Sequence, residues 1–185
     1  NNIFWSSKIK WFAKSSGTTN AKSKFIPVSN ESLEDCHYAA GKDLLCMYLS
    51  NNPNSQLFTG KSLRLGGSKT PYEKNGTFYG DLSAILIDNM PFWAEFSSTP
   101  SNKTSLMEDW DYKMAAIINE TLNENVTSLA GVPSWMLVLL NKILKESKKE
   151  YISEIWPNLE VYFHGGVSFK PYLNQYDAII NKDSM

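Results

Sequence analysis

The sequence has little cysteine, no excess of positive charge and no long apolar run. Its 185 residues carry 18 lysine and arginine side chains against 19 aspartate and glutamate side chains, a net charge of −1 at pH 7. Proteins that bind nucleic acids or anionic membrane surfaces usually need a basic patch, so this balance favours neither partner. The sequence contains no stretch of 18 apolar residues and therefore predicts no membrane-spanning helix.

The two cysteines, Cys36 and Cys46, fall within one predicted helix. About 15 Å of helix rise separates them, which is too far for a disulfide inside that helix. We expect both to be buried thiols in a reducing compartment. The N-terminus also lacks the basic start and apolar run of a targeting signal, so the sequence predicts a cytoplasmic protein.

The composition is that of one folded domain. Apolar residues make up 42% of the chain and charged residues 20%, as in ordinary globular proteins. The length allows one substantial core and is short for two domains. Because there is neither an initiator Met nor an evident end signal, we expect residues 1–185 to be a single partial domain of a longer protein.

Strand patterns alternate with helical patterns along the chain. The Asn75-Gly76 pair predicts a type I′ hairpin, and residues 97–104 are polar enough to predict a loop. No internal repeat or linker is evident, so the sequence predicts an α/β layered domain, or part of one. Strands are expected over residues 9–14, 24–28, 61–65, 126–130 and 159–163, and helices begin near residues 30, 80, 105, 133 and 170.

The most informative segment is the loop between the first two predicted strands. Hydroxyl side chains surround Gly17, and a lysine cluster follows. Backbone N–H groups, hydroxyls and ammonium groups together suit a polyanion, and a nucleotide triphosphate suits them best. A Ser/Thr/Gly cluster that stands alone is more commonly a plain turn. The Walker pattern fails because Ala21 precedes Lys22-Ser23, and the dinucleotide fingerprint lacks its further glycines.

The loop resembles the phosphate loop of adenylate-forming enzymes, and within them the auxin-responsive acyl acid–amido synthetase family. Residues 15–19 (Ser-Ser-Gly-Thr-Thr) and 24–27 (Lys-Phe-Ile-Pro) carry this resemblance, and Asn20 departs from it by replacing a glycine. Asparagine tolerates positive φ, so the loop shape can survive. Further blocks that look like bacterial members follow in the family's order, at residues 65–71, 80–83, 89–93, 131–135, 156–159 and 163–169.

The resemblance implies part of the large N-terminal domain of an adenylate-forming enzyme, with a mixed β-sheet flanked by helices. It implies a phosphate loop, an adenine and ribose loop, an acyl pocket and an amine-substrate segment. His164 and His37 are expected to be structural, packing is the commoner role for Trp135, and Gly165-Gly166 alone would suit a strand-to-helix turn. The implied residues of the phosphate loop are Ser15, Ser16, Gly17, Thr18, Thr19 and Lys24, and those of the adenine and ribose loop are Gly165, Gly166, Val167 and Ser168. The implied residues of the acyl pocket are Pro133 and Trp135, and those of the amine-substrate segment are Lys69 and Thr70.

The resemblance also implies a reaction and its cofactors, ATP and Mg²⁺. A carboxylic acid would be activated as acyl-AMP and transferred to an amine, usually an amino acid, to form an amide. The family's later Ser-Glu and Arg-Gly-Asp-like motifs and its C-terminal domain are absent, and so is any metal ligand set. We therefore expect the remainder of the polypeptide to be this chain's partner, and the 185 residues alone to be inactive.

Two alternatives remain open at the level of sequence. The parent protein can transfer the acyl group to coenzyme A, as related ligases do. The chain can also be a non-catalytic structural or interaction module, in which case it would not bind nucleotide.

Overall fold

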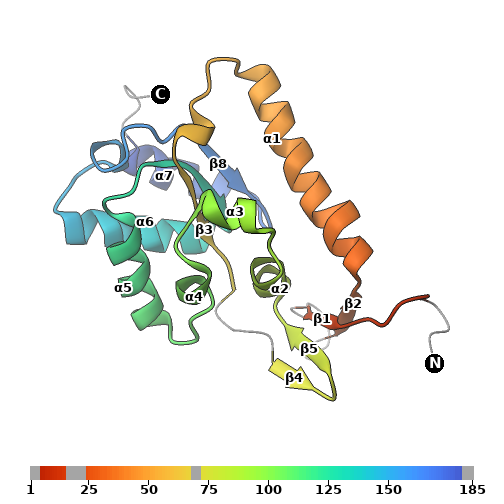
Figure 1. Ribbon diagram of the computed structural model, residues 1–185. Coiled ribbons are helices and arrows are strands. Elements are labelled where there is room, and N and C mark those ends of the chain that lie inside the picture. Colours follow the sequence, from red (N-terminus) through yellow and green to blue (C-terminus); the bar gives the residue numbers. More distant parts are fainter. Residues whose placement is uncertain (1–4, 16–23, 68–71, 181–185) are drawn as a thin grey trace. The chain divides into compact units, whose positions relative to one another are not determined.

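The computed structural model describes residues 5–15, 24–67 and 72–180, and the chain divides into two compact units (Figure 1). Unit 1 comprises Asn1–Asn54 and Gly67–Met90. Unit 2 comprises Ser55–Gly66 and Pro91–Met185. Each unit contains one four-stranded sheet flanked by helices, which confirms the predicted mixed α/β class.

The sheet of unit 1 is mixed. Its strand order is β2-β1-β5-β4; β1 pairs with β5 in parallel, and the two outer pairs are antiparallel. Asn75 and Gly76 form the turn between β4 and β5 with φ values of 54° and 71°, as the predicted type I′ turn requires. The strands are β1 (Trp11–Lys14), β2 (Phe25–Val28), β4 (Tyr72–Lys74) and β5 (Thr77–Gly80).

Three helical segments accompany this sheet. The Ser29 hydroxyl accepts a hydrogen bond from the Ser32 amide (3.1 Å), the first residue of the first of them. A small core of Ala13, Val28, Leu33 and Ile85 joins one face of the sheet to the helices. The segments are the π-helix η1 (Ser32–Tyr38), α1 (Ala39–Asn51) and α2 (Leu82–Asp88).

The expectation of buried cysteines is wrong. Cys36 and Cys46 are free thiols, and both are exposed. Helix α1 has no buried residue, and its apolar side chains Leu44 and Met47 are 48% and 64% exposed. The apolar spacing identified the residues that share a helix face, but it could not tell whether another element packs on that face.

The sheet of unit 2 is entirely parallel, with the strand order β6-β3-β7-β8. All four strands therefore end at the same edge. Parallel sheets of this kind carry their ligand sites beyond the carboxyl ends of the strands. The strands are β3 (Lys61–Leu65), β6 (Ser98–Thr99), β7 (Val126–Gly131) and β8 (Val161–His164).

Most of the buried apolar side chains of unit 2 belong to one cluster formed by the sheet and the two long helices α5 and α6. Helix α6 begins with Pro133 at its first position, as predicted, and buries an apolar face that includes Leu140 and Ile143. Trp156 is 1% exposed and donates from Nε1 to the Thr121 carbonyl oxygen (3.1 Å). The helices are η2 (Leu57–Thr59), α3 (Phe92–Phe96), α4 (Asn102–Ser105), α5 (Trp110–Thr121), α6 (Pro133–Ser147), η3 (Ile152–Glu154), η4 (Lys170–Tyr172) and α7 (Leu173–Ile179).

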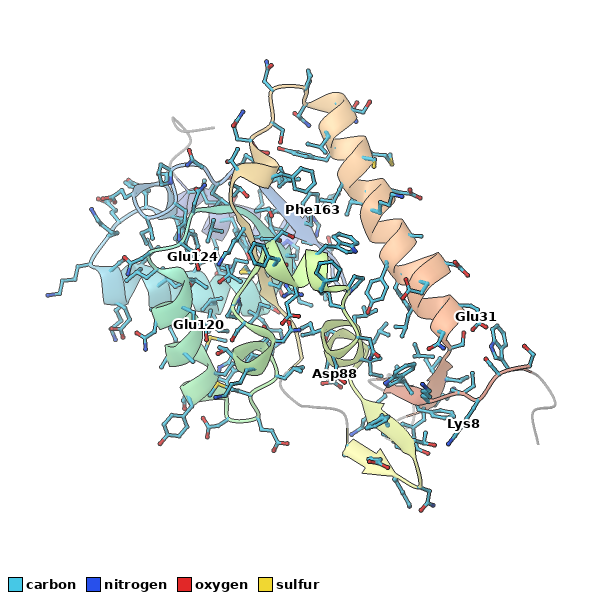
Figure 2. All side chains as sticks on the ribbon, in the orientation of Figure 1. Lys8, Glu31, Asp88, Glu120, Glu124 and Phe163 are labelled. Carbon is cyan, nitrogen blue, oxygen red and sulfur yellow. The ribbon has the colours of Figure 1, made fainter. Side chains whose placement is uncertain are left out.

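The predicted loop over residues 97–104 is wrong, since β6 and the start of α4 lie within it. Glu120 lies on α5 (Figure 2). It holds this polar segment by accepting hydrogen bonds from the Ser101 amide (2.7 Å) and the Thr104 hydroxyl. The helix expected from residue 105 begins instead at Trp110, because the Asp109 carboxylate caps it by accepting from the Tyr112 amide (3.0 Å).

Candidate functional site

The carboxyl edge of the parallel sheet in unit 2 brings two of the predicted residue sets together. Strand β7 ends at Gly131 and leads into Pro133, and the neighbouring strand β8 ends at His164 and leads into the Gly165-Gly166 turn. A Cβ placed on Gly166 would lie 3.5 Å from the Val132 side chain, so the two loops touch. The predicted adenine and ribose loop therefore lies beside the predicted acyl pocket.

Backbone conformation gives the two glycines distinct properties. Gly166 has a φ of 82°, which disfavours residues with a Cβ. Nothing lies within 4 Å of a Cβ built on Gly165. The following residues Val167 and Ser168 are exposed. The turn thus presents accessible backbone at the sheet edge, a property suited to close approach by a flat ligand.

Two tyrosines fix the turn after β7, and the sequence reasoning missed both. Tyr162 donates from its hydroxyl to the Gly131 carbonyl oxygen (3.1 Å), and Tyr176 on α7 donates to the Pro133 carbonyl oxygen (2.8 Å). Burial raises the pKa of both phenols, so both remain donors at neutral pH. The two-residue spacing of Tyr162 and His164 along β8 is the sequence signal that could have placed Tyr162 on the same face as His164, whereas Tyr176 had no such signal.

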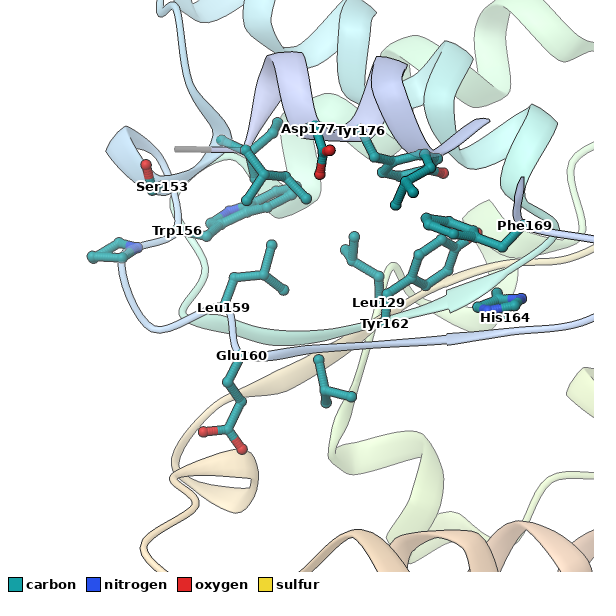
Figure 3. A pocket seen from close by; sticks show the side chains of 15 residues that line it. Leu129, Ser153, Trp156, Leu159, Glu160, Tyr162, His164, Phe169, Tyr176 and Asp177 are labelled. Carbon is teal, nitrogen blue, oxygen red and sulfur yellow. The ribbon is translucent and has the colours of Figure 1, made fainter. Parts of the chain in front are cut away.

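An apolar cavity of about 300 Å³ lies beside these tyrosines, between the end of the sheet and α7 (Figure 3). Two of its lining residues, His164 and Phe169, stack on each other with 4.8 Å between the ring centroids. Neither Pro133 nor Trp135 lines it. The lining residues are Leu129, Ile152, Ser153, Trp156, Pro157, Leu159, Glu160, Val161, Tyr162, His164, Phe169, Leu173, Tyr176, Asp177 and Ile180.

The two residues of the predicted acyl pocket differ in burial. Pro133 is buried at the start of α6, whereas Trp135 is 54% exposed. The Trp135 ring packs edge-on against Trp110 with 4.8 Å between centroids. Part of the Trp135 indole thus packs against Trp110, and the rest is accessible to solvent. This arrangement does not decide whether the indole contacts an acyl group, so the acyl pocket remains a prediction.

Lys113 on α5 is a second group that the sequence reasoning missed. Its side chain is fully buried, and its ammonium group donates to the Gly66 carbonyl oxygen (3.1 Å) just beyond the end of β3. Burial lowers the pKa of this lysine to about 8. The sequence did not predict that Lys113 is buried, because lysines on helices are usually exposed to solvent.

The predicted phosphate loop belongs to unit 1, and only its two ends are described. The Ser15 amide donates to the Lys24 carbonyl oxygen (2.8 Å), and the Ser15 hydroxyl accepts from the Lys24 amide (3.2 Å). The Lys24 residue is exposed. These bonds extend the β1–β2 hairpin and bring the two ends of the loop together. Ser16, Gly17, Thr18 and Thr19 lie outside the described residues.

The predicted amine-substrate residues Lys69 and Thr70 also lie outside the described residues. The chain enters that segment at Gly67, whose amide donates to the Ser83 hydroxyl oxygen (2.8 Å). A Cβ on Gly67 would come within 3.1 Å of Asp81. This close approach explains a glycine here, whereas the role of the next residues stays a prediction.

No group of three or more His, Cys, Asp or Glu side chains is placed to hold a metal ion among the residues that the structure describes. Across the same parts of the chain, no helix has the length and apolarity needed to cross a membrane.

Comparisons with known proteins agree with the architecture. The family model described as the GH3 family N-terminal domain matches residues 1–185. The comparison with curated proteins gives no match.

Among solved structures, the chain is similar to AtGH3.15, an acyl acid amido synthetase in complex with 2,4-DB. The TM-score is 0.57 and the identity 22%, over 75% of this chain and 24% of that one. The similarity shows the fold. The chain spans about a quarter of the length of that relative.

Proposed function

The chain belongs to the GH3 family, and we propose that it forms the nucleotide-binding part of an ATP-dependent acyl-adenylating ligase. The intact protein would activate a carboxylic acid as acyl-AMP and transfer it to the amine of an amino acid. We further propose that it is a bacterial-type, cytoplasmic member within the luciferase-like adenylate-forming superfamily.

One observation carries the proposal beyond family membership: the open glycine turn at the carboxyl edge of a parallel sheet. Open α/β sheets bind their ligands at this edge. Gly165 has free space on its Cβ side, and the adjoining loop begins the predicted acyl pocket at Pro133. The arrangement suits a nucleoside and an acyl group bound side by side.

In the proposed reaction, the substrate carboxylate attacks the α-phosphate of ATP and pyrophosphate leaves. Negative charge on the departing phosphates must be offset. We assign the offsetting of this charge to hydrogen-bond donors of residues 15–19 and to the exposed Lys24 just before β2. Backbone of residues 165–168 would adjoin the adenine and ribose. ATP would bring Mg²⁺ with it.

The second half of the reaction needs an amine and protection from water. The amine attacks the acyl carbon and AMP leaves, forming the amide, whereas water at the same carbon would waste the adenylate. We assign Lys69 and Thr70 to the amine side. Because the motifs expected for ribose and metal binding are not in this sequence, the 185 residues are expected to bind phosphate weakly and not to catalyse adenylation.

An ATP titration followed by amide NMR tests the proposal on the 185-residue chain. Amide signals from residues 15–24 should shift, and Lys24→Ala should weaken binding several-fold by removing a cation. Lys42→Ala removes an exposed lysine of α1 in the same unit and should leave the titration unchanged. If those amides do not respond to ATP, the chain is a non-catalytic module and the proposal fails.

The acceptor is tested separately on the intact protein. Product analysis with ATP, a panel of carboxylic acids and either amino acids or coenzyme A should yield amides. Thioester as the main product would make the protein an acyl-CoA-forming ligase instead. Carboxylate-dependent ATP–pyrophosphate exchange by the isolated 185 residues would overturn the expectation that they are inactive.

A further inference from the structure

One face of the sheet in unit 1 carries a row of aromatic side chains. The strand register places Phe12 opposite Tyr79 and Tyr79 opposite Tyr72, while Lys14 lies opposite Phe25. These residues alternate with Ala13 and Val28, which belong to the core on the other face. Phe25 and Tyr72 are 44% and 48% exposed. Among the described residues of unit 1, the packed core lies only on the opposite face.

Three of the four rings stack on one another, and the fourth meets the stack edge-on. Tyr79 stacks with Phe12 and with Tyr72, with 5.4 Å between centroids in each pair, and Phe25 meets Tyr79 edge-on at 5.3 Å. The stacked rings of Phe12, Tyr79 and Tyr72 thus cover one another's faces. The row is therefore poorly suited to stacking a nucleobase or another flat ligand. It suits packing against aliphatic side chains.

Sheet geometry is compatible with a helix as the element that packs there. The central pair β1 and β5 is parallel, although the two outer pairs are antiparallel, and parallel strands occur mainly in sheets whose two faces are both covered by helices. Four strands about 4.8 Å apart span roughly 15 Å, which a helix of about 10 residues covers. A helix laid across the strands would contact all four rings.

Positive charge beside the aromatic row indicates which flanking residues the docked helix should carry. Lys14 and Lys74 are exposed on the same face, at positions flanking the aromatic row. The strand residues that the register places on this face include no aspartate or glutamate; Glu73 alternates to the opposite side. A helix with an apolar stripe and acidic flanking residues complements this pattern.

We propose that the aromatic face of Phe12, Phe25, Tyr72 and Tyr79 is the docking surface for an amphipathic helix of the same polypeptide, from outside residues 1–185. The similar solved structure supports this choice of occupant, since the present chain spans 24% of its length. A covalently attached helix has a high effective concentration and needs little affinity of its own. The docked helix would complete the helix–sheet–helix layering of unit 1.

Hydroxyl-radical footprinting of the 185-residue chain and of the complete gene product tests the proposal without relying on activity. Labelling of Phe25 and Tyr72 should fall several-fold in the complete protein. Tyr112 on α5 is 74% exposed and serves as the internal reference. Equal labelling in the two proteins, or a gene that encodes no further helix, overturns the proposal. So does protection that depends on the concentration of the 185-residue chain, which would indicate a second copy as the occupant.

A matched pair of substitutions gives a second readout. Tyr72→Glu should leave the melting temperature of the 185-residue chain nearly unchanged but lower that of the complete protein by several degrees, because it places a carboxylate under the acidic helix. Tyr112→Glu makes the same chemical change on α5 and should have little effect in either protein. A Tyr72→Glu effect of equal size in both proteins contradicts the proposal.

Discussion

The two units differ in how much of their sheet is covered. Among the described residues, unit 2 buries sixteen apolar side chains in one cluster around its parallel sheet. The corresponding cluster of unit 1 contains four, on one face of its mixed sheet. Because buried apolar area is the main source of stability, unit 2 should be the more stable of the two.

This difference separates the candidate site residues by the stability of their surroundings. The loops at Pro133 and Gly165 extend from the strongly packed sheet, and Tyr176 fixes the first of them. The predicted phosphate loop instead extends from the hairpin of the unit with the smaller core. The first set is thus held by unit 2 alone, whereas unit 1 has less packing to hold its loop.

The largest expected effect comes from the core of unit 2. Trp156→Ala removes a fully buried indole and the hydrogen bond to the Thr121 carbonyl, and should cost unit 2 about 4 kcal/mol. Urea unfolding followed by circular dichroism measures the loss. Trp93→Ala, at a site 58% exposed in the same unit, should cost far less. Similar losses for the two variants would contradict the assigned core.

Lys113 gives the next largest effect, as a dependence on pH. The pKa of the buried amine is about 8, so the unfolded chain binds more protons than the folded chain from pH 8 up to the usual lysine pKa near 10.4. The unfolding free energy of unit 2 should therefore rise with pH across this window, by at most about 3 kcal/mol. Below pH 8 the cost of burying the charge is fully present.

Comparison with Lys113→Met isolates this contribution. The methionine side chain is also unbranched, is one heavy atom shorter and cannot titrate, so the rise between pH 8 and 10 should disappear. Tyr162 and Tyr176, whose pKa values are raised by burial, are common to the two proteins and cancel in the difference. The same pH dependence in the variant would mean that Lys113 stays charged in the folded state.

Leu33→Ala should have the smallest effect, about 2 kcal/mol, confined to unit 1. Leu33 is 3% exposed but has few buried neighbours, which places it at the low end for such truncations. Amide hydrogen exchange should accelerate in β1 and β5 and stay unchanged in β7. Faster exchange in β7 as well would show that the two units unfold together.

Much of the local structure could be predicted from the sequence. Asn75-Gly76 predicted its turn, and Pro133 predicted the first position of α6, because these residues restrict their own backbone. Residues 97–104 were misassigned because the structure of this segment depends on Glu120. This residue lies sixteen positions after Thr104 and accepts hydrogen bonds from Ser101 and Thr104.

The candidate site was predicted in part. The sequence predicted that the loops at Pro133 and Gly165 carry function, but not that they touch through Val132 and Gly166. It gave no indication of Lys113 or Tyr176, since the residue type does not reveal whether a helical side chain points into the core. The roles of Ser16, Gly17, Thr18 and Thr19 remain predictions.

By itself, the sequence determined short-range features of this protein: most of its strands, the Asn75-Gly76 turn, the first position of α6 and its resemblance to a family. These depend on backbone preferences and on residues close together in the chain. Only the tertiary structure decided that all four strands of unit 2 end at one edge, that Cys36 and Cys46 are exposed, and that the packed core among the described residues of unit 1 lies on the face opposite the aromatic row. Burial and strand order depend on which distant segments pack together, and a local pattern does not contain that information.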